Sequence, residues 1–154
     1  MGAKYRIVLP QTAVTAAVDL LELLSPTAKS IKLCRLRLWT KKTTTEMVRL
    51  TLKRVTGSPT SGSGGSTATP QGMSTLFSSP SVTAEIFNTT RISGGTSTTL
   101  MEESFNLAVG FEWVPSEIDE KDEHEGATRL VWGLEDAPAA STNFMGHAIV
   151  EVVG

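Results

Sequence analysis

The stretch Met-Val-Arg-Leu-Thr-Leu-Lys-Arg at residues 47–54 has the most regular alternation in the chain. Aliphatic residues occupy every second position, at Val48, Leu50 and Leu52, and charged or hydroxyl residues stand between them. Successive side chains of a β-strand point to opposite faces, so this pattern predicts a strand with one apolar and one polar face.

A second alternating segment precedes it, from Ser30 to Lys41. Its aliphatic residues stand at odd positions at first and at even positions from Leu36 onward. A change of phase inside one strand is typical of a β-bulge. The Thr-rich stretch 41–46 joins the two segments and predicts a hairpin between them.

The start of the chain has two further β-prone runs. Residues 4–9 form a short run that Pro10 is expected to stop, because proline cannot donate a hydrogen bond to a strand ladder. Residues 13–24 fit either an amphipathic helix or a fully buried strand over 18–24. We favour the strand.

The second half of the chain repeats short alternating runs separated by turn residues such as Gly94-Gly95 and Pro138. The expected strands in this half are 82–86, 100–107, 110–114, 130–134 and 144–153. The last of them places five residues on one face, namely Phe144, Gly146, Ala148, Val150 and Val152. The chain as a whole predicts one all-β domain over residues 1–154, a jelly-roll-like antiparallel β-sandwich of about eight strands with one long ordered loop.

The long loop covers residues 56–78 and consists almost entirely of Gly, Ser, Thr and Pro up to residue 72. Ordering such a segment costs about 1–2 kcal/mol of backbone entropy per residue, so contacts outside the loop must offset that cost. Met73, Leu76 and Phe77 follow the polar tract and are the expected anchors. They dock either on the core of this domain or on a neighbouring subunit, and we predict that they contact a partner.

Charge is unevenly distributed along the chain. The formal net charge is −2, but residues 1–55 carry 11 Lys and Arg against 3 Asp and Glu, and residues 56–154 carry 3 against 13. One interpretation is a basic face that binds nucleic acid. We favour another, in which a β-fold interleaves the two halves and opposite charges meet across strands or across a subunit contact. We therefore expect no nucleic-acid partner.

The composition argues against two other classes of protein. Cys34 is the only cysteine, so there is no internal disulfide framework. No apolar stretch approaches the roughly 20 residues needed to cross a bilayer. The start of the sequence also lacks the pattern of a signal peptide, and we expect no membrane partner.

Few residues offer catalytic or metal chemistry. The two histidines, His124 and His147, lack the spacing of a metal-binding motif, and Cys34 lies in an expected strand, where a buried thiol is inert. The acidic run 117–125 lacks the alternating carboxylates of a calcium loop and predicts a solvated loop. We expect no catalytic, cofactor-binding or metal-binding residue and no enzymatic activity. A hydrolase is an open alternative that requires His147 in a pocket beside a Ser, Asp or Glu.

Three parts of the chain resemble the decoration, cement or head-auxiliary proteins of tailed bacteriophages. The first is the run Thr-Ala-Val-Thr-Ala-Ala-Val-Asp-Leu-Leu-Glu-Leu at 12–23, which leads into Pro26 and the basic strand 30–39. The second is Gly-Phe-Glu-Trp-Val-Pro at 110–115. The third is the closing pair of strands, 129–134 and 145–153, around an Ala-Pro-Ala-Ala turn.

The resemblance implies a structural protein on the exterior of the virion that is assembled in the host cytoplasm. Its partner would be the major capsid protein, and it would act as a homotrimer that stabilises contacts between capsid subunits. An alternative is a carbohydrate- or host-surface-binding sandwich of a phage fibre, which predicts exposed aromatic side chains. The chain has three tryptophans, Trp39, Trp113 and Trp132, and all three lie in expected strands, which favours their burial in the core. Burial of all three would count against the carbohydrate-binding alternative.

Overall fold

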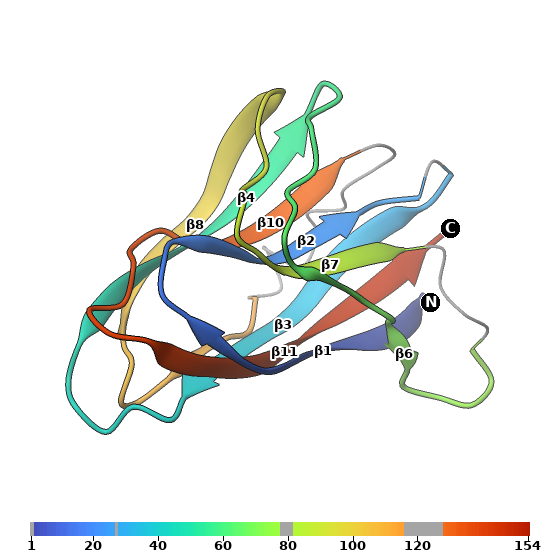
Figure 1. Ribbon diagram of the computed structural model, residues 1–154. Helices are drawn as coiled ribbons and strands as arrows, with labels where there is room; N and C mark the ends of the chain where they lie inside the picture. Colours follow the sequence, from blue (N-terminus) through green and yellow to red (C-terminus); the bar gives the residue numbers. More distant parts are fainter. Residues whose placement is uncertain (1, 27, 78–81, 116–127) are drawn as a thin grey trace.

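The computed structural model describes residues 2–26, 28–77, 82–115 and 128–154, which form two antiparallel sheets packed against each other (Figure 1). The first sheet, called sheet A, has the strand order β6 (Gln71–Gly72), β1 (Ala3–Val14), β11 (Thr142–Val153), β3 (Ser30–Thr40) and β9 (Phe111–Trp113). The second, sheet B, has the order β5 (Ser66–Ala68), β7 (Thr83–Asn88), β2 (Val18–Leu24), β10 (Arg129–Leu134), β4 (Met47–Thr56) and β8 (Thr96–Asn106). The described residues contain no helix that is long and apolar enough to cross a membrane.

This architecture confirms the predicted all-β sandwich. Eight of the strands in the described ranges have six residues or more, and the three short ones are β5, β6 and β9. From β1 to β4 the chain alternates between the two sheets. The strand order is compatible with a jelly roll, and that subtype stays a prediction. The acidic run 117–125 and His124 lie outside the described residues.

The predicted hairpin over residues 41–46 is wrong. β3 lies in sheet A between β11 and β9, whereas β4 lies in sheet B between β10 and β8. The connection therefore crosses from one sheet to the other. Alternation fixes which face of each strand is apolar, but both sheets of a sandwich turn that face to the same core, so the pattern does not identify the neighbouring strand.

Strands β3 and β1 of sheet A each contain one irregular position, where the pairing register with β11 shifts. Along β3, Leu33 pairs with Val150 and Arg35 pairs with Ile149, so that Cys34 is the extra residue of a bulge, as the phase change predicted. β1 continues past Pro10, although proline was expected to end it. The register of β1 against β11 shifts between Leu9 and Thr12, so Pro10 lies where the ladder is already interrupted.

The Gly- and Ser-rich segment is fixed to its own domain. It contains β5, which pairs with β7, and β6, which pairs with β1. Two isolated bridges, Thr60 with Ser93 and Ser63 with Thr90, hold its first part through backbone hydrogen bonds of 2.8–3.1 Å. A side chain at Gly65 would place its Cβ 2.1 Å from the Ile86 carbonyl oxygen, so the close approach to β7 requires glycine. No neighbouring subunit is needed to order this segment.

The core lies between the sheets and is built from the inward positions that alternation predicted. β2 is a strand, as favoured, and all but its last residue are buried. The inner face of β11 is buried at every predicted position from Phe144 to Val152. Trp132 of β10 and Phe144 are among the largest fully buried side chains.

Replacing Phe144 with alanine should destabilise the fold by about 3–5 kcal/mol, because it removes a ring with no exposed surface and leaves a cavity. Urea unfolding followed by tryptophan fluorescence measures the change. Val109→Ala is the matched control, since Val109 is 81% exposed. Equal losses in the two variants would contradict this assignment of the core.

Candidate functional site

The predicted contact residues Met73, Leu76 and Phe77 lie directly after β6 at the edge of sheet A, and we call them the apolar corner. They are 49%, 90% and 39% exposed. The Phe77 ring packs at 6.2 Å from the ring of Tyr5, so this residue is anchored on its own domain. Leu76 and Phe77 also line a cavity of about 230 Å³ with residues near both chain ends.

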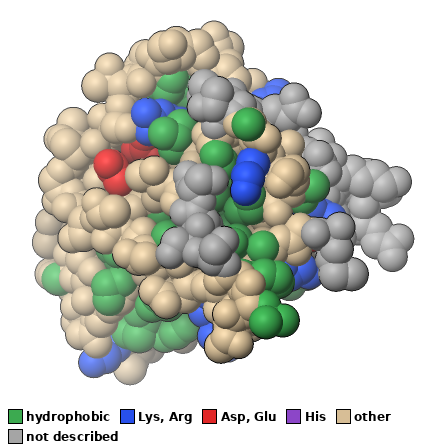
Figure 2. Space-filling model, turned by 90° about the vertical axis from the view of Figure 1, so that its right-hand side faces the viewer, with side chains coloured by type: hydrophobic (Ala, Val, Ile, Leu, Met, Phe, Trp, Pro, Cys, Tyr) green, Lys and Arg blue, Asp and Glu red, His purple; other side chains and the backbone are tan. Residues whose placement is uncertain are grey.

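The side of the molecule that carries both termini is seen in Figure 2. Hydrophobic side chains lie there in several groups with Lys or Arg side chains nearby, and acidic side chains form one small group. Exposed hydrophobic groups of this kind are candidate contact areas for other proteins. A partner contact by the apolar corner stays a prediction.

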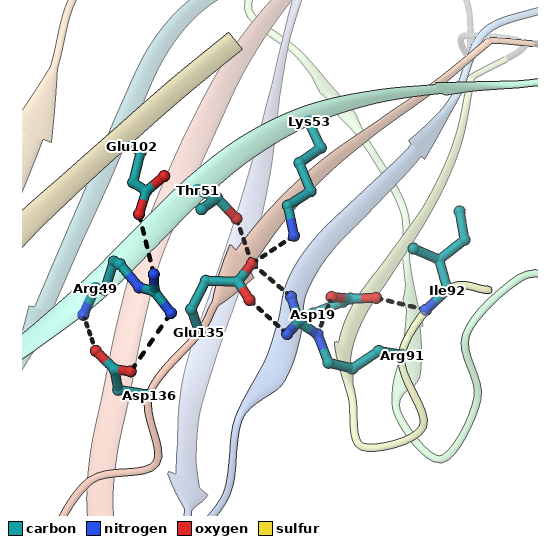
Figure 3. A network of polar contacts seen from close by, with 9 residues as sticks. All are labelled: Asp19, Arg49, Thr51, Lys53, Arg91, Ile92, Glu102, Glu135 and Asp136. Atoms are coloured by element: carbon teal, nitrogen blue, oxygen red, sulfur yellow. Dashed lines mark hydrogen bonds and ion pairs between the residues drawn. The ribbon is translucent and has the colours of Figure 1, made fainter. Parts of the chain in front are cut away.

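A network of buried charges covers the outer face of sheet B (Figure 3). Arg91, in the connection between β7 and β8, donates from Nε to Asp19 at 2.8 Å and from both terminal nitrogens to Glu135 at 2.8 Å. Glu135 also accepts hydrogen bonds from Thr51 and Lys53 of β4. The backbone N–H of Ile92 donates to the second oxygen of Asp19 at 2.7 Å.

Burial makes these ion pairs interdependent. The side chain of Asp19 has no exposed surface and that of Glu135 is 12% exposed, so both carboxylates have left water and need their cation. Hydrogen bonds from Arg91 hold the pKa of Glu135 well below its usual range and outweigh the effect of burial. The same contact raises the pKa of Arg91.

A second buried carboxylate, Glu22, fixes the neighbouring loop. Arg129 of β10 donates to one oxygen of Glu22 at 2.5 Å, and the backbone N–H of Gly62 donates to the other at 3.0 Å. Asn88 adds a longer contact to that second oxygen. The two carboxylates of β2 therefore fasten both loops that cover sheet B, one through Gly62 and the other through Arg91.

The network encloses a surface pocket of about 310 Å³ whose charged lining residues are Asp19, Lys53 and Arg91. All three are already engaged in ion pairs with one another or with Glu135. A charged ligand would have to break those pairs, so the geometry favours a structural role for the network. In the described part of the chain, no three His, Cys, Asp or Glu side chains lie close enough to hold a metal ion.

The sequence interpretation missed this network, although it contained a signal. Asp19 and Glu22 interrupt an otherwise aliphatic run, Val-Asp-Leu-Leu-Glu-Leu-Leu at residues 18–24. A carboxylate within a fully buried strand requires a cationic or hydrogen-bonding partner. Which of the chain's arginines supplies it depends on contacts between residues 72 and 107 positions apart.

His147 lies on the outer face of sheet A, opposite Val8 of β1 and Arg37 of β3. Its ring meets the edge of Trp39 at 6.0 Å, and among the described residues its imidazole has no hydrogen bond to a Ser, Asp or Glu. Burial and nearby arginines lower its pKa. The arrangement that the hydrolase alternative required is therefore not formed by these residues.

The expected burial of the tryptophans is confirmed for one of the three. Trp132 is fully buried, and Trp113 is partly buried against the core. Trp39 is half-buried on the outer face of sheet A, where the guanidinium carbon of Arg37 lies 5.3 Å from its ring centre. Its placement in the core was wrong, because the bulge at Cys34 shifts the inward positions to Leu36 and Leu38.

Replacing Arg91 with methionine should destabilise the protein by about 3–5 kcal/mol, because it leaves the carboxylate of Asp19 buried without a cation. Arg49→Met is the matched control. Arg49 also bridges two carboxylates, Glu102 and Asp136, but all three side chains are about half exposed and the cost should stay below about 1 kcal/mol. Chemical unfolding of the two variants measures the difference, and equal losses would contradict a buried network.

Acidification should remove the contribution of Glu135. Its folded-state pKa lies below the ordinary value of 4.5, so its ionisation stabilises the fold above that pH, and the contribution is lost as the pH falls. Glu135→Gln should therefore be less stable at neutral pH and should lose less stability on acidification than the original protein. Unfolding curves across the acidic range test this, and parallel pH profiles would refute it.

Comparisons with known proteins found no matching family model, curated protein or solved structure.

Proposed function

We propose that this protein is a structural virion protein. It binds the outer surface of a phage capsid as a homotrimer and stabilises contacts between major capsid subunits. The observation that carries the proposal is the apolar corner, which is solvent-exposed although the segment before it is fastened to the domain.

Rigidity supports this role. The two loops over sheet B are held by buried ion pairs, and the Gly- and Ser-rich segment is held by strand pairing. A module that is already ordered loses little conformational entropy when it binds, so more of its contact energy remains for holding subunits together. A stable contact needs about 1,000 Å² of buried surface, and repetition over a capsid lattice strengthens weaker contacts through avidity.

The exposed apolar side chains suit a protein partner. Met73 is 49% exposed and Leu76 is 90% exposed, so both present apolar surface to solvent. A small cluster of aliphatic and aromatic side chains at the edge of a sheet can anchor a contact by filling a pocket on a partner.

A fibre module that binds carbohydrate or a host surface is a second candidate, and Trp39 is the observation that favours it. Its ring is half-buried on an outer sheet face instead of lying in the core. Sugar-binding proteins use such rings as platforms. A glycan array with the original protein and Trp39→Ala tests this candidate, and a glycan bound only by the original protein would favour it over the capsid role.

The main experiment mixes purified protein with empty shells assembled from the major capsid protein encoded nearest its gene. Co-sedimentation should recover the protein with the shells, and shells carrying it should withstand higher temperature or denaturant concentration. Analytical ultracentrifugation should give the mass of three chains. A monomer that stays in the supernatant at every shell concentration would disprove the proposal.

The double substitution Met73→Ser and Leu76→Ser should weaken shell binding at least about tenfold and should change the free energy of unfolding by less than about 1 kcal/mol, because Leu76 is 90% and Met73 49% exposed. Phe77 is left in place because it packs on Tyr5. Val109→Ser is the control, since Val109 is also an exposed aliphatic residue but lies away from the corner. Unchanged co-sedimentation of the double variant would exclude the apolar corner from the contact.

A further inference from the structure

The two sheets differ in how they balance their charges. On sheet B, the β4 cations Arg49 and Lys53 meet carboxylates of the acidic part of the chain. This agrees with the favoured interpretation of the charge asymmetry, in which opposite charges meet across strands. On sheet A the basic strands β1 and β3 both lie beside β11, which contributes a single carboxylate to the outer face.

Among the described residues, the outer face of sheet A therefore carries more cations than carboxylates, and we call it the basic face. Register places five cations on it, in two rows on either side of β11: Lys4, Arg6, Lys32, Arg35 and Arg37. Its two carboxylates are occupied, because Glu112 pairs with Arg35 and Glu151 accepts a hydrogen bond from the backbone of Gly2. In the described part of the chain, Lys4, Arg6 and Arg37 have no carboxylate partner.

The centre of the basic face is ordered and carries apolar surface. The cation–π contact with Trp39 holds the Arg37 side chain, and His147 packs against the same ring. Arg6 and Arg37 are among the groups that lower the pKa of His147, which places their positive field at this centre. Val8, which is 49% exposed, pairs with His147 and adds an aliphatic group between the cations.

We propose that the basic face docks on an acidic surface of another protein. On a phage head, the acidic surface would belong to the capsid, and this assignment of the partner rests on the proposed function. Positive charge on one side and carboxylates on the other steer the encounter and fix its orientation. The apolar corner follows the edge strand β6, which pairs with Tyr5 and Arg6 of β1, so the corner adjoins the basic face at Arg6.

A protein partner fits this face better than a small molecule or a nucleic acid. None of the five cations of the basic face lines either of the two cavities described above. Arginine, tryptophan and aliphatic side chains on one surface are the composition of protein contact sites. Single-stranded nucleic acid needs several exposed rings for stacking, whereas the Trp39 ring is already in contact with Arg37 and His147.

The first experiment uses generic probes and does not depend on the capsid. The ¹⁵N-labelled protein is titrated with a short poly-L-glutamate and with single-stranded DNA of equal charge, at low and at physiological salt. We expect poly-L-glutamate to shift amide signals of β1, β3 and β11. The charge reversal R6E/R37E should weaken this binding at least about tenfold.

The matched control is K41E/R49E, which makes the same change in charge at exposed positions outside both the basic face and the apolar corner. Because glutamate substitutions can impair folding, R6Q/R37Q serves as a milder variant and should weaken binding in the same direction. The proposal is overturned if the signals map elsewhere, if the control variant loses as much affinity, or if DNA binds at least tenfold more tightly at physiological salt. The last result would identify a nucleic-acid site.

The second experiment repeats co-sedimentation with empty shells. Loss of binding in R6E/R37E and retention in K41E/R49E would support docking of the basic face on the capsid. If the original protein and R6E/R37E bind shells equally, the capsid role stands and the basic face is not the contact. If neither binds shells while poly-L-glutamate still maps to the basic face, the capsid role fails and the acidic-protein site stands.

Discussion

Arg91 holds Asp19 and Glu135 together on the outer face of sheet B, and the loops over that face depend on this contact. The side chain of Asp19 is wholly buried, so removing its cation would leave a buried negative charge without an ion-pair partner. Through the N–H of Ile92 the same carboxylate orders the connection between β7 and β8. Glu22 acts in the same way on the loop at Gly62. The two carboxylates of β2, Asp19 and Glu22, thus fasten the loops over sheet B, and Glu22 fixes the glycine-rich segment at Gly62.

This arrangement leaves the sandwich with two unlike outer faces. Sheet B is covered by its loops, and ion pairs between β4 and its surroundings neutralise much of its charge. In the described part of the chain, the outer face of sheet A carries a row of cations on each side of β11, and the rings of Trp39 and His147 lie beside Arg37. The contacts that we propose with a partner use the outer face of sheet A and its edge at the apolar corner, where the described cations and apolar side chains are exposed.

Sequence alternation predicted strand positions and inward residues well, because the burial of a side chain depends on which face of its own strand it occupies. The alternation of β4 and β11 and the bulge at Cys34 are examples, because a side chain that points inward must be apolar wherever the strand lies. The hairpin over 41–46 was wrong because neighbouring strands along the chain entered different sheets. Pro10 did not end β1, because a register shift removed the need for its N–H.

The amino-acid sequence by itself determined the all-β class and most of the inward residues, because alternation and turn residues act over a few positions. Only the tertiary structure decided which arginine neutralises Asp19, where Trp39 lies and which sheet keeps the positive surplus. These features depend on which strands become neighbours, and residues as far apart as Glu22 and Arg129 meet only after the sheets have assembled. Burial then makes such contacts strong, since a charge removed from water must find its partner within the fold.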